Sequence, residues 1–250
     1  MTTQTVAAVD DSLMVPRYGS PLFWVNMVIA WCGVAVSFML TVTGYFTSTI
    51  DLTKPTILGN IPTGIDSPLE RILDWLTYFT DLSNLIVAVV LTVLVMRPDY
   101  FARTDRIGSM WRALRLDSVL MIAITGIVYN LLLAEGPKTG WDFVSNSLEH
   151  VITPIVTILV WLLAGPRGLI NIRVIGLSMI VPLAWALVAL LRGAAVGAYP
   201  YSFLDVTTNG LGSVLAFIGV IVLVALIIAF ALMGLDALFR RMSAGFRARG

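Results

Sequence analysis

This chain is poor in the residues that most metal sites, haem sites and disulfides require. Among its 250 residues there is one cysteine, Cys32, one histidine, His150, and only two lysines, Lys54 and Lys138. A single cysteine forms no disulfide within one chain, and a single histidine excludes bis-histidine haem and multi-histidine zinc sites. Both lysines fall in expected loops, so a retinal Schiff base inside a helical bundle is excluded. We therefore expect no cofactor and no metal.

Charge is equally scarce. Charged residues make up 12% of the chain, against about 25% in an average soluble domain. Hydrophobic residues reach 58% and the mean hydropathy is +0.91, which indicates an integral membrane protein. The formal net charge of +1 gives no reason to expect nucleic acid as a partner. Because the apolar runs lack the period-two alternation of outer-membrane barrel strands, we expect an all-α fold.

Six apolar runs are long enough to span a bilayer, for which about 20 residues are needed. We expect six transmembrane helices at roughly 22–47, 71–96, 114–134, 147–164, 171–191 and 210–237. The first run is too long for a signal peptide and lacks its small-residue cleavage site, so we expect it to be retained. The chain then divides into a disordered cytoplasmic tail (1–20), one membrane domain (21–240) and a basic cytoplasmic tail (241–250).

Arginine placement predicts the orientation of this bundle. Twelve of the sixteen lysines and arginines fall in the N-terminal tail, the two even-numbered loops and the C-terminal tail, whereas the opposite side holds only Lys54, Arg71, Lys138 and Arg192. By the positive-inside rule, both termini are expected in the cytoplasm. The sequence therefore predicts a multi-pass protein of a cell inner membrane or plasma membrane.

The second run contains an unusual polar stretch, YFTDLSN, at residues 78–84. In one continuous helix, side chains spaced i, i+3, i+4 and i+7 share a face. That face is Thr77, Thr80, Asp81 and Asn84, extended one turn by Asp74 and bordered by Ser83. Interhelical hydrogen bonds explain any single threonine or asparagine here. An ionisable group such as Asp81 at this depth is instead a candidate functional residue.

The fourth run supplies a complementary group in the sequence LEHVITP, residues 148–154. Pro154 lacks a backbone N–H, so the carbonyl of His150 loses its helical partner and the helix is expected to bend. At about 1.5 Å per residue, His150 lies roughly 12 Å from the outer end of its helix and Thr80 roughly 13 Å from that of its own. A hydroxyl and an imidazole at one level are the minimum for base-activated nucleophilic attack.

These residues resemble a known family of six-pass proteins, the androgen-induced and androgen-dependent membrane hydrolases. The matching stretches are YFTDLSN, HVITP followed by WLLAGPRG, and YPYSFLDV at 199–206. The resemblance implies hydrolysis of fatty acid esters of hydroxy fatty acids, with Thr80 as nucleophile and His150 as base. The chain departs from the pattern late in the fourth helix, where Val160 or Trp161 stands in place of an expected acidic residue.

Facing and depth suggest supporting roles for neighbouring polar residues in such a hydrolase. Candidates to stabilise an oxyanion or to orient the reacting groups are Asn84, Ser83, Asn130, Tyr129 and Asn146. Asp81 and Asp74 are candidates for an adjoining polar network. The expected partner is a lipid or fatty-acyl ester that enters sideways from the membrane, with its chains held by apolar walls. We expect the YPYSFLDV segment to fold back as a cap, or to be a simple interfacial aromatic belt.

Two other functions remain open at this point. A non-catalytic lipid-binding or regulatory protein would not bring Thr80 and His150 together. A small proton-linked transporter would use buried acids as a relay, and the candidates are Asp74, Asp81, Asp117 and Glu149. Such a carrier needs a water-filled path that reaches both faces of the membrane.

Overall fold

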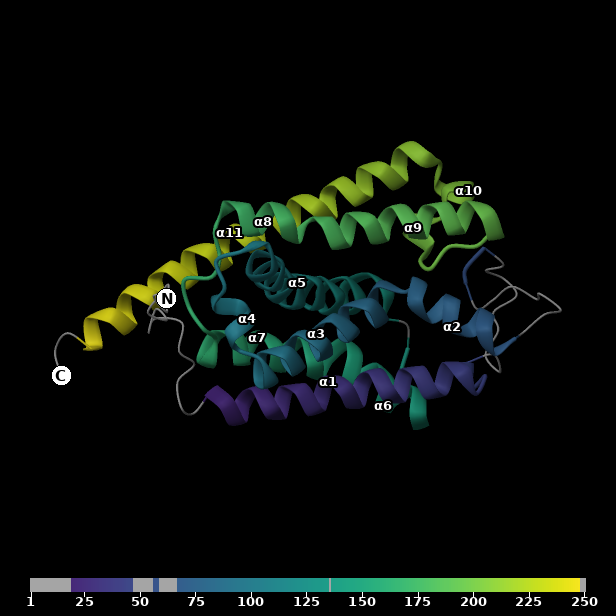
Figure 1. The fold of residues 1–250 in the computed structure, drawn as a ribbon. Helices are drawn as coiled ribbons and strands as arrows, with labels where there is room; N and C mark the ends of the chain where they lie inside the picture. Colours follow the sequence, from purple (N-terminus) through teal and green to yellow (C-terminus); the bar gives the residue numbers. More distant parts are fainter. Residues whose placement is uncertain (1–18, 47–55, 59–66, 135, 248–250) are drawn as a thin grey trace, which may run out of the picture.

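The computed structural model describes residues 19–46, 56–58, 67–134 and 136–247 (Figure 1). In this part of the chain, six helices are long and apolar enough to cross a membrane: Ser20–Val42, Phe79–Met96, Arg106–Leu133, Gly140–Ala164, Ile172–Val196 and Leu211–Met242. The prediction of a multi-pass helical membrane protein is therefore confirmed. Of the proposed tails at 1–20 and 241–250, residues 1–18 and 248–250 lie outside the described residues, as does Lys54, whereas 19–20 and 241–247 belong to helices.

From α2 onward, the helices follow one another with short connections. Their bounds are α1 (Gly19–Val42), α2 (Pro68–Thr77), α3 (Phe79–Met96), α4 (Asp99–Ala102), α5 (Arg106–Val128), α6 (Gly140–Ser147), α7 (Thr153–Ala164), α8 (Ile172–Ser178), α9 (Ile180–Val196), α10 (Val206–Asn209) and α11 (Leu211–Arg247). Two π-helical turns, Tyr129–Leu133 and Leu148–Ile152, continue α5 and precede α7. The described residues contain no β-strand, only an isolated bridge between Ile57 and Tyr199.

The expected single helix over 71–96 is wrong at one position, because the chain leaves helical geometry at Tyr78. Its backbone is extended there (φ −74°, ψ 130°), and α2 ends before it. The N-terminus of α2 begins earlier than predicted, where Ser67 and Glu70 form a capping box around Pro68. The carbonyl of Thr77 that the break leaves free accepts a hydrogen bond from Trp185 Nε1 at 2.9 Å. Tertiary contacts therefore stabilise this break, although no proline or glycine lies at it.

Other boundaries also shift. The third and fourth spans begin at 106 and 140, earlier than the predicted 114 and 147, because polar first turns are helical as well. Asp105 caps α5 by accepting a hydrogen bond from Gly108 N at 2.9 Å. The fifth span is divided into α8 and α9 at Met179, three residues before Pro182. The last helix continues to Arg247, ten residues past the predicted end at 237.

The core lies where α1, α3, α5 and α7 pack together, with α3 between α1 and α5 (Figure 1). Its fully buried side chains are mostly small or β-branched: Ala30, Val87, Ala88, Val90, Leu91 and Ile122. Gly126 permits close contact of α5 and α7, since a Cβ there would lie 3.1 Å from Pro154 Cβ. The helices α8, α9 and α11 cover another side of α5. At the start of α3, Asp81 faces Ser37 of α1, whereas Thr80 faces Tyr201 in the segment between α9 and α11.

Candidate active site

The break at Tyr78 places Thr80 in the first turn of α3. The N–H groups of Phe79, Thr80 and Asp81 lie in the first turn of α3, so they have no acceptor carbonyl within the helix. Such a terminus carries a partial positive charge and directs N–H donors at whatever lies before it. A hydroxyl at this position is therefore close to groups that stabilise negative charge.

The Thr80 hydroxyl meets two other side chains. Its Oγ1 lies 3.3 Å from His150 Nε2 and 3.4 Å from the hydroxyl oxygen of Tyr201. That same tyrosine oxygen accepts a hydrogen bond from the Thr80 N–H at 3.2 Å. The predicted approach of Thr80 and His150 is confirmed, and Tyr201 adds a third polar group that the sequence did not associate with them.

His150 is held by its backbone and by its ring face. Because Pro154 has no N–H, the His150 carbonyl is free, and Asn130 Nδ2 donates to it at 3.0 Å while also donating to Gly126 O at 2.8 Å. Tyr129 stacks on the imidazole with ring centroids 3.6 Å apart. The backbone of Asn146 approaches the ring, although Nδ1 makes no hydrogen bond of normal geometry within the described residues. These contacts aim Nε2 at Thr80.

Asn84 and Ser83 bond to the backbone behind Thr80. Asn84 Nδ2 donates to Thr80 O at 2.9 Å and to Glu149 O at 3.3 Å. Ser83 Oγ donates to Thr80 O at 2.8 Å and lies 2.8 Å from Thr125 Oγ1. These bonds hold the carbonyl of Thr80 and tie α3 to its neighbours. Neither side chain bonds to the Thr80 hydroxyl, so the structure gives them positioning roles.

The acids of the predicted polar stripe point in different directions, because the break at Tyr78 changes the helix phase. Asp81 turns toward α1, where Ser37 Oγ donates to it at 2.6 Å, and its carboxyl contacts that of Glu149. Two carboxyl groups in contact in an apolar interior are stabilised by sharing one proton. Asp74, on α2, forms an ion pair with Arg192 of α9. Neither acid contacts the imidazole.

The segment 199–206 folds over this end of the bundle, as expected of a cap. Tyr199 packs into the space above Gly193, where a Cβ would lie 2.2 Å from its ring. Asp205 anchors the segment by accepting hydrogen bonds from Thr207, Thr208 and Thr56. Although burial by itself raises the pKa of the Asp205 carboxyl, these bonds outweigh it and lower the pKa to about 2. Burial raises the pKa of the Tyr201 phenol to about 12, so it stays a neutral O–H group.

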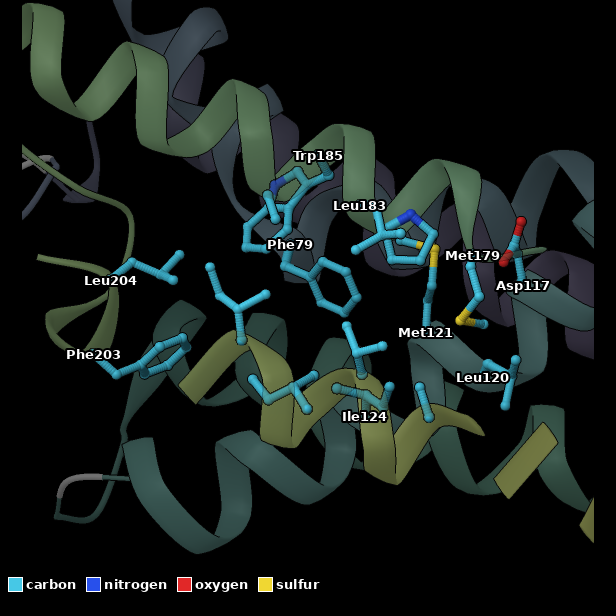
Figure 2. Close-up of a pocket in the computed structure, with 16 residues that line it drawn as sticks. Phe79, Asp117, Leu120, Met121, Ile124, Met179, Leu183, Trp185, Phe203 and Leu204 are labelled. Atoms are coloured by element: carbon cyan, nitrogen blue, oxygen red, sulfur yellow. The ribbon is translucent and has the colours of Figure 1, made fainter. Parts of the chain in front are cut away.

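Thr80 lines one cavity, which adjoins a second, larger one. The smaller, with an empty volume of about 410 Å³, is lined by Thr80, Tyr129 and Tyr201. The larger, of about 600 Å³, runs between α5, α9 and α11, and Figure 2 shows its apolar side chains from Phe203 at one end to Asp117 at the other. Both are lined by a shared group of residues, namely Phe79, Ile124, Trp185, Phe203 and Ile221. The Thr80 hydroxyl therefore adjoins a space suited to a hydrocarbon chain.

Two further expectations concern other parts of the chain. Val160 and Trp161 are buried in the core, and the Arg167 guanidinium lies over the Trp161 ring at 5.0 Å, so this position contributes packing.

Within the described ranges, no cluster of three or more histidine, cysteine, aspartate or glutamate residues could hold a metal.

Sequence reasoning missed the break at Tyr78 and the approach of Tyr201 to Thr80. The aromatic segment YPYSFLDV was a signal for a cap, but it did not show which ring would reach Thr80. Comparisons of the chain with family models, with curated proteins and with solved structures find no match.

Proposed function

We propose that this protein is a membrane-embedded hydrolase of lipid-like acyl esters, with Thr80 as nucleophile and His150 as general base. The observation that carries the proposal is the 3.3 Å approach of Thr80 Oγ1 to His150 Nε2 at the N-terminus of α3. A hydroxyl, a neutral imidazole and N–H donors beside an apolar cavity are the parts that acyl transfer requires.

The first chemical step follows from this geometry. With the imidazole proton on Nδ1, toward the Asn146 backbone, Nε2 accepts the proton of the Thr80 hydroxyl as Oγ1 attacks the ester carbonyl carbon. The C=O bond becomes a C–O⁻ single bond in a tetrahedral intermediate. When the carbonyl re-forms, the ester C–O bond breaks and the alcohol leaves with the proton from Nε2. A water molecule then repeats the sequence on the Thr80 acyl ester and releases the acid.

The developing oxyanion needs donors in a dry site. Tyr201 O–H is one, because the phenol remains neutral and its oxygen lies 3.4 Å from Thr80 Oγ1. The N–H of Thr80 is a second, since it faces the same tyrosine and becomes available if that oxygen moves to the substrate. The partial positive charge at the start of α3 favours the same intermediate.

The alternative of a proton-linked carrier finds less support in the placement of the acids. Asp74 is ion-paired with Arg192, Asp81 and Glu149 contact each other, and Asp117 lines the cavity beside α9. The four acids therefore occupy three separate places, whereas a relay requires one chain of exchange partners. A non-catalytic lipid-binding role shares the cavity but gives no reason for the threonine–histidine contact.

We further propose that both termini are cytoplasmic, on the basis of arginine placement. The site then lies toward the outer leaflet, and its cavity is open to acyl chains from that leaflet. The resemblance to the androgen-induced and androgen-dependent hydrolases supports the same substrate class, esters of long-chain acids.

The proposal is tested with purified protein in lipid nanodiscs. We expect turnover of medium- and long-chain acyl esters, abolished in Thr80→Ala, partly retained in Thr80→Ser and nearly abolished in His150→Ala. A phosphonate probe should label the parent at residue 80, as read by peptide mass spectrometry.

The matched control is Thr92→Ala, the same chemical change on the same helix, because among the described residues Thr92 Oγ1 bonds to Ala88 O and Trp31 and not to the site. It should leave turnover unchanged. If Thr80→Ala hydrolysed esters as fast as the parent, the threonine mechanism would be wrong.

A further inference from the structure

The larger cavity has an acidic residue at the end that lies away from Thr80. On α5, the side chains Ile124, Met121, Leu120 and Asp117 are spaced i, i+3, i+4 and i+7, so all four line the cavity from one helical face. Figure 2 shows Asp117 beside Met179 and Leu120, at the opposite end from Phe203. The cavity is therefore apolar along its length and bounded by a carboxyl group.

Asp117 has no role in the fold that the described residues reveal. Its side chain is only 1% exposed, and neither carboxyl oxygen has a hydrogen-bond partner among the described residues. A buried polar group without a partner destabilises the folded state. An apolar residue at this position would avoid that cost, so the carboxyl group calls for a partner that the described residues do not supply.

Helix geometry gives the distance between this carboxyl and the reactive hydroxyl. Ser83 touches Thr125 on α5, so Thr125 marks the level of Ser83, and Thr80 lies three residues, or about 4.5 Å, before Ser83 along α3. Asp117 precedes Thr125 by eight residues, which is about 12 Å along α5, so Asp117 and Thr80 differ in level by about 16 Å. An acyl chain whose carbonyl lies at Thr80 and whose tail extends through the cavity would end near Asp117.

We infer that Asp117 recognises a hydroxyl group on the buried acyl chain, about 16 Å from the scissile carbonyl. The proposed substrates are thus esters of acids that carry a free hydroxyl toward the far end of the chain. This inference rests on the proposed hydrolase function, because that function defines where the carbonyl lies.

A hydroxyl suits this position better than a charged group. Transfer of an ammonium or carboxylate into the apolar cavity carries a desolvation cost of several kcal/mol, even when the charge is paired. A hydroxyl carries a smaller cost, and it both donates to and accepts from a carboxyl group. A hydroxyl would therefore form hydrogen bonds with the Asp117 carboxyl, whereas a plain alkyl tail leaves that carboxyl without a hydrogen-bond partner.

The test measures binding separately from turnover. In a Thr80→Ala background, which retains ligand without cleaving it, affinities are determined in nanodiscs for matched esters that end in methyl, hydroxyl, amine or carboxylate. A second series moves the hydroxyl along the chain one methylene at a time. We expect the hydroxyl ester to be favoured over the methyl ester most strongly when the hydroxyl lies at the distance of Asp117.

The variant that isolates the carboxyl is Asp117→Leu. It should lower the hydroxyl-to-methyl preference by roughly ten- to a hundredfold, the range expected when a buried hydroxyl loses its partner, and it should melt no lower than its parent. Asp117→Asn should keep part of the preference. Met121→Leu, a change of shape without polarity in the same cavity, should leave the preference unchanged.

The outcomes separate the two proposals. An equal preference in Asp117→Leu and its parent, or tighter binding of the amine or carboxylate ester, would overturn the recognition of a hydroxyl by Asp117. A lower melting temperature for Asp117→Leu would assign the carboxyl to folding instead. Thr80-dependent turnover of plain esters without any hydroxyl preference would leave the hydrolase standing and this inference refuted. A hydroxyl preference that depends on Asp117, in a protein that cleaves no ester, would support the recognition of a hydroxyl and refute the hydrolase.

Discussion

Removal of the Tyr201 hydroxyl is the sharpest test of the oxyanion donor. Tyr201→Phe deletes one oxygen and keeps the ring, whose neighbours include Tyr78 at 5.7 Å and Phe203 at 5.1 Å between centroids. Thr80 and His150 retain their direct 3.3 Å approach in this variant. The change therefore removes a donor without removing the nucleophile or the base.

The magnitude follows from what the oxygen contacts. Loss of one oxyanion donor typically lowers kcat by about 10²–10³-fold, or about 3–4 kcal/mol of transition-state stabilisation. The ground-state cost is smaller, since the Thr80 N–H loses one acceptor, worth about 1 kcal/mol. We therefore expect a large fall in kcat with little change in KM and a modest fall in thermal stability.

The assay is steady-state ester hydrolysis by purified protein, with thermal unfolding measured on the same samples. Tyr199→Phe is the matched control. Tyr199 lies two residues before Tyr201 in the same segment, and its ring packs over Gly193. The Tyr201 phenol has a pKa of about 12, so its O–H is present at every pH up to 10 and the wild-type profile should show no loss from its ionisation. A kcat for Tyr201→Phe within twofold of wild type would exclude the tyrosine as oxyanion donor.

Three further predictions concern the surroundings of the site. Asn130→Ala should destabilise the protein by about 1–3 kcal/mol and slow turnover, because it leaves the His150 carbonyl without its donor; unchanged melting would contradict this. The bonds to Asp205 stabilise the cap above pH 4, and this stabilisation should be lost as pH falls toward 2; limited proteolysis at low pH should find no such acid step in Asp205→Asn. In a Cys32→Ala background, Lys138→Cys should react with an impermeant maleimide from outside intact cells, and labelling only after lysis would reverse the topology.

The sequence was sufficient for the parts of the structure that depend on hydropathy and spacing. Six spans follow from apolar runs, and the shared level of Thr80 and His150 follows from counting residues along two helices that start on the same side. The bond of Asn130 to the His150 carbonyl is also a local consequence of Pro154, since a freed carbonyl in an apolar interior must find a donor.

What depends on tertiary contacts was not predictable. The break at Tyr78 contains neither proline nor glycine and is stabilised by Trp185, which lies more than a hundred residues later in the chain. Since the break changes helix phase, Asp74 and Asp81 no longer belong to one stripe. Asn84 was a candidate oxyanion donor because of the helix face it occupies, yet its Nδ2 donates to two backbone carbonyls. The role of Tyr201 depended on how a loop folds back, which periodicity does not describe.

The two π-helical turns at Tyr129–Leu133 and Leu148–Ile152 act as single-residue insertions in otherwise α-helical segments. Deleting one residue from either turn would restore the regular ladder and rotate one side of that helix by about 100° relative to the other. A chain with the same hydropathy and the same Thr80 and His150, but one residue fewer before Pro154, would carry both reactive groups without bringing them together. In a search for proteins that share this chemistry, the spacing between the histidine and the proline is therefore more informative than the presence of either residue.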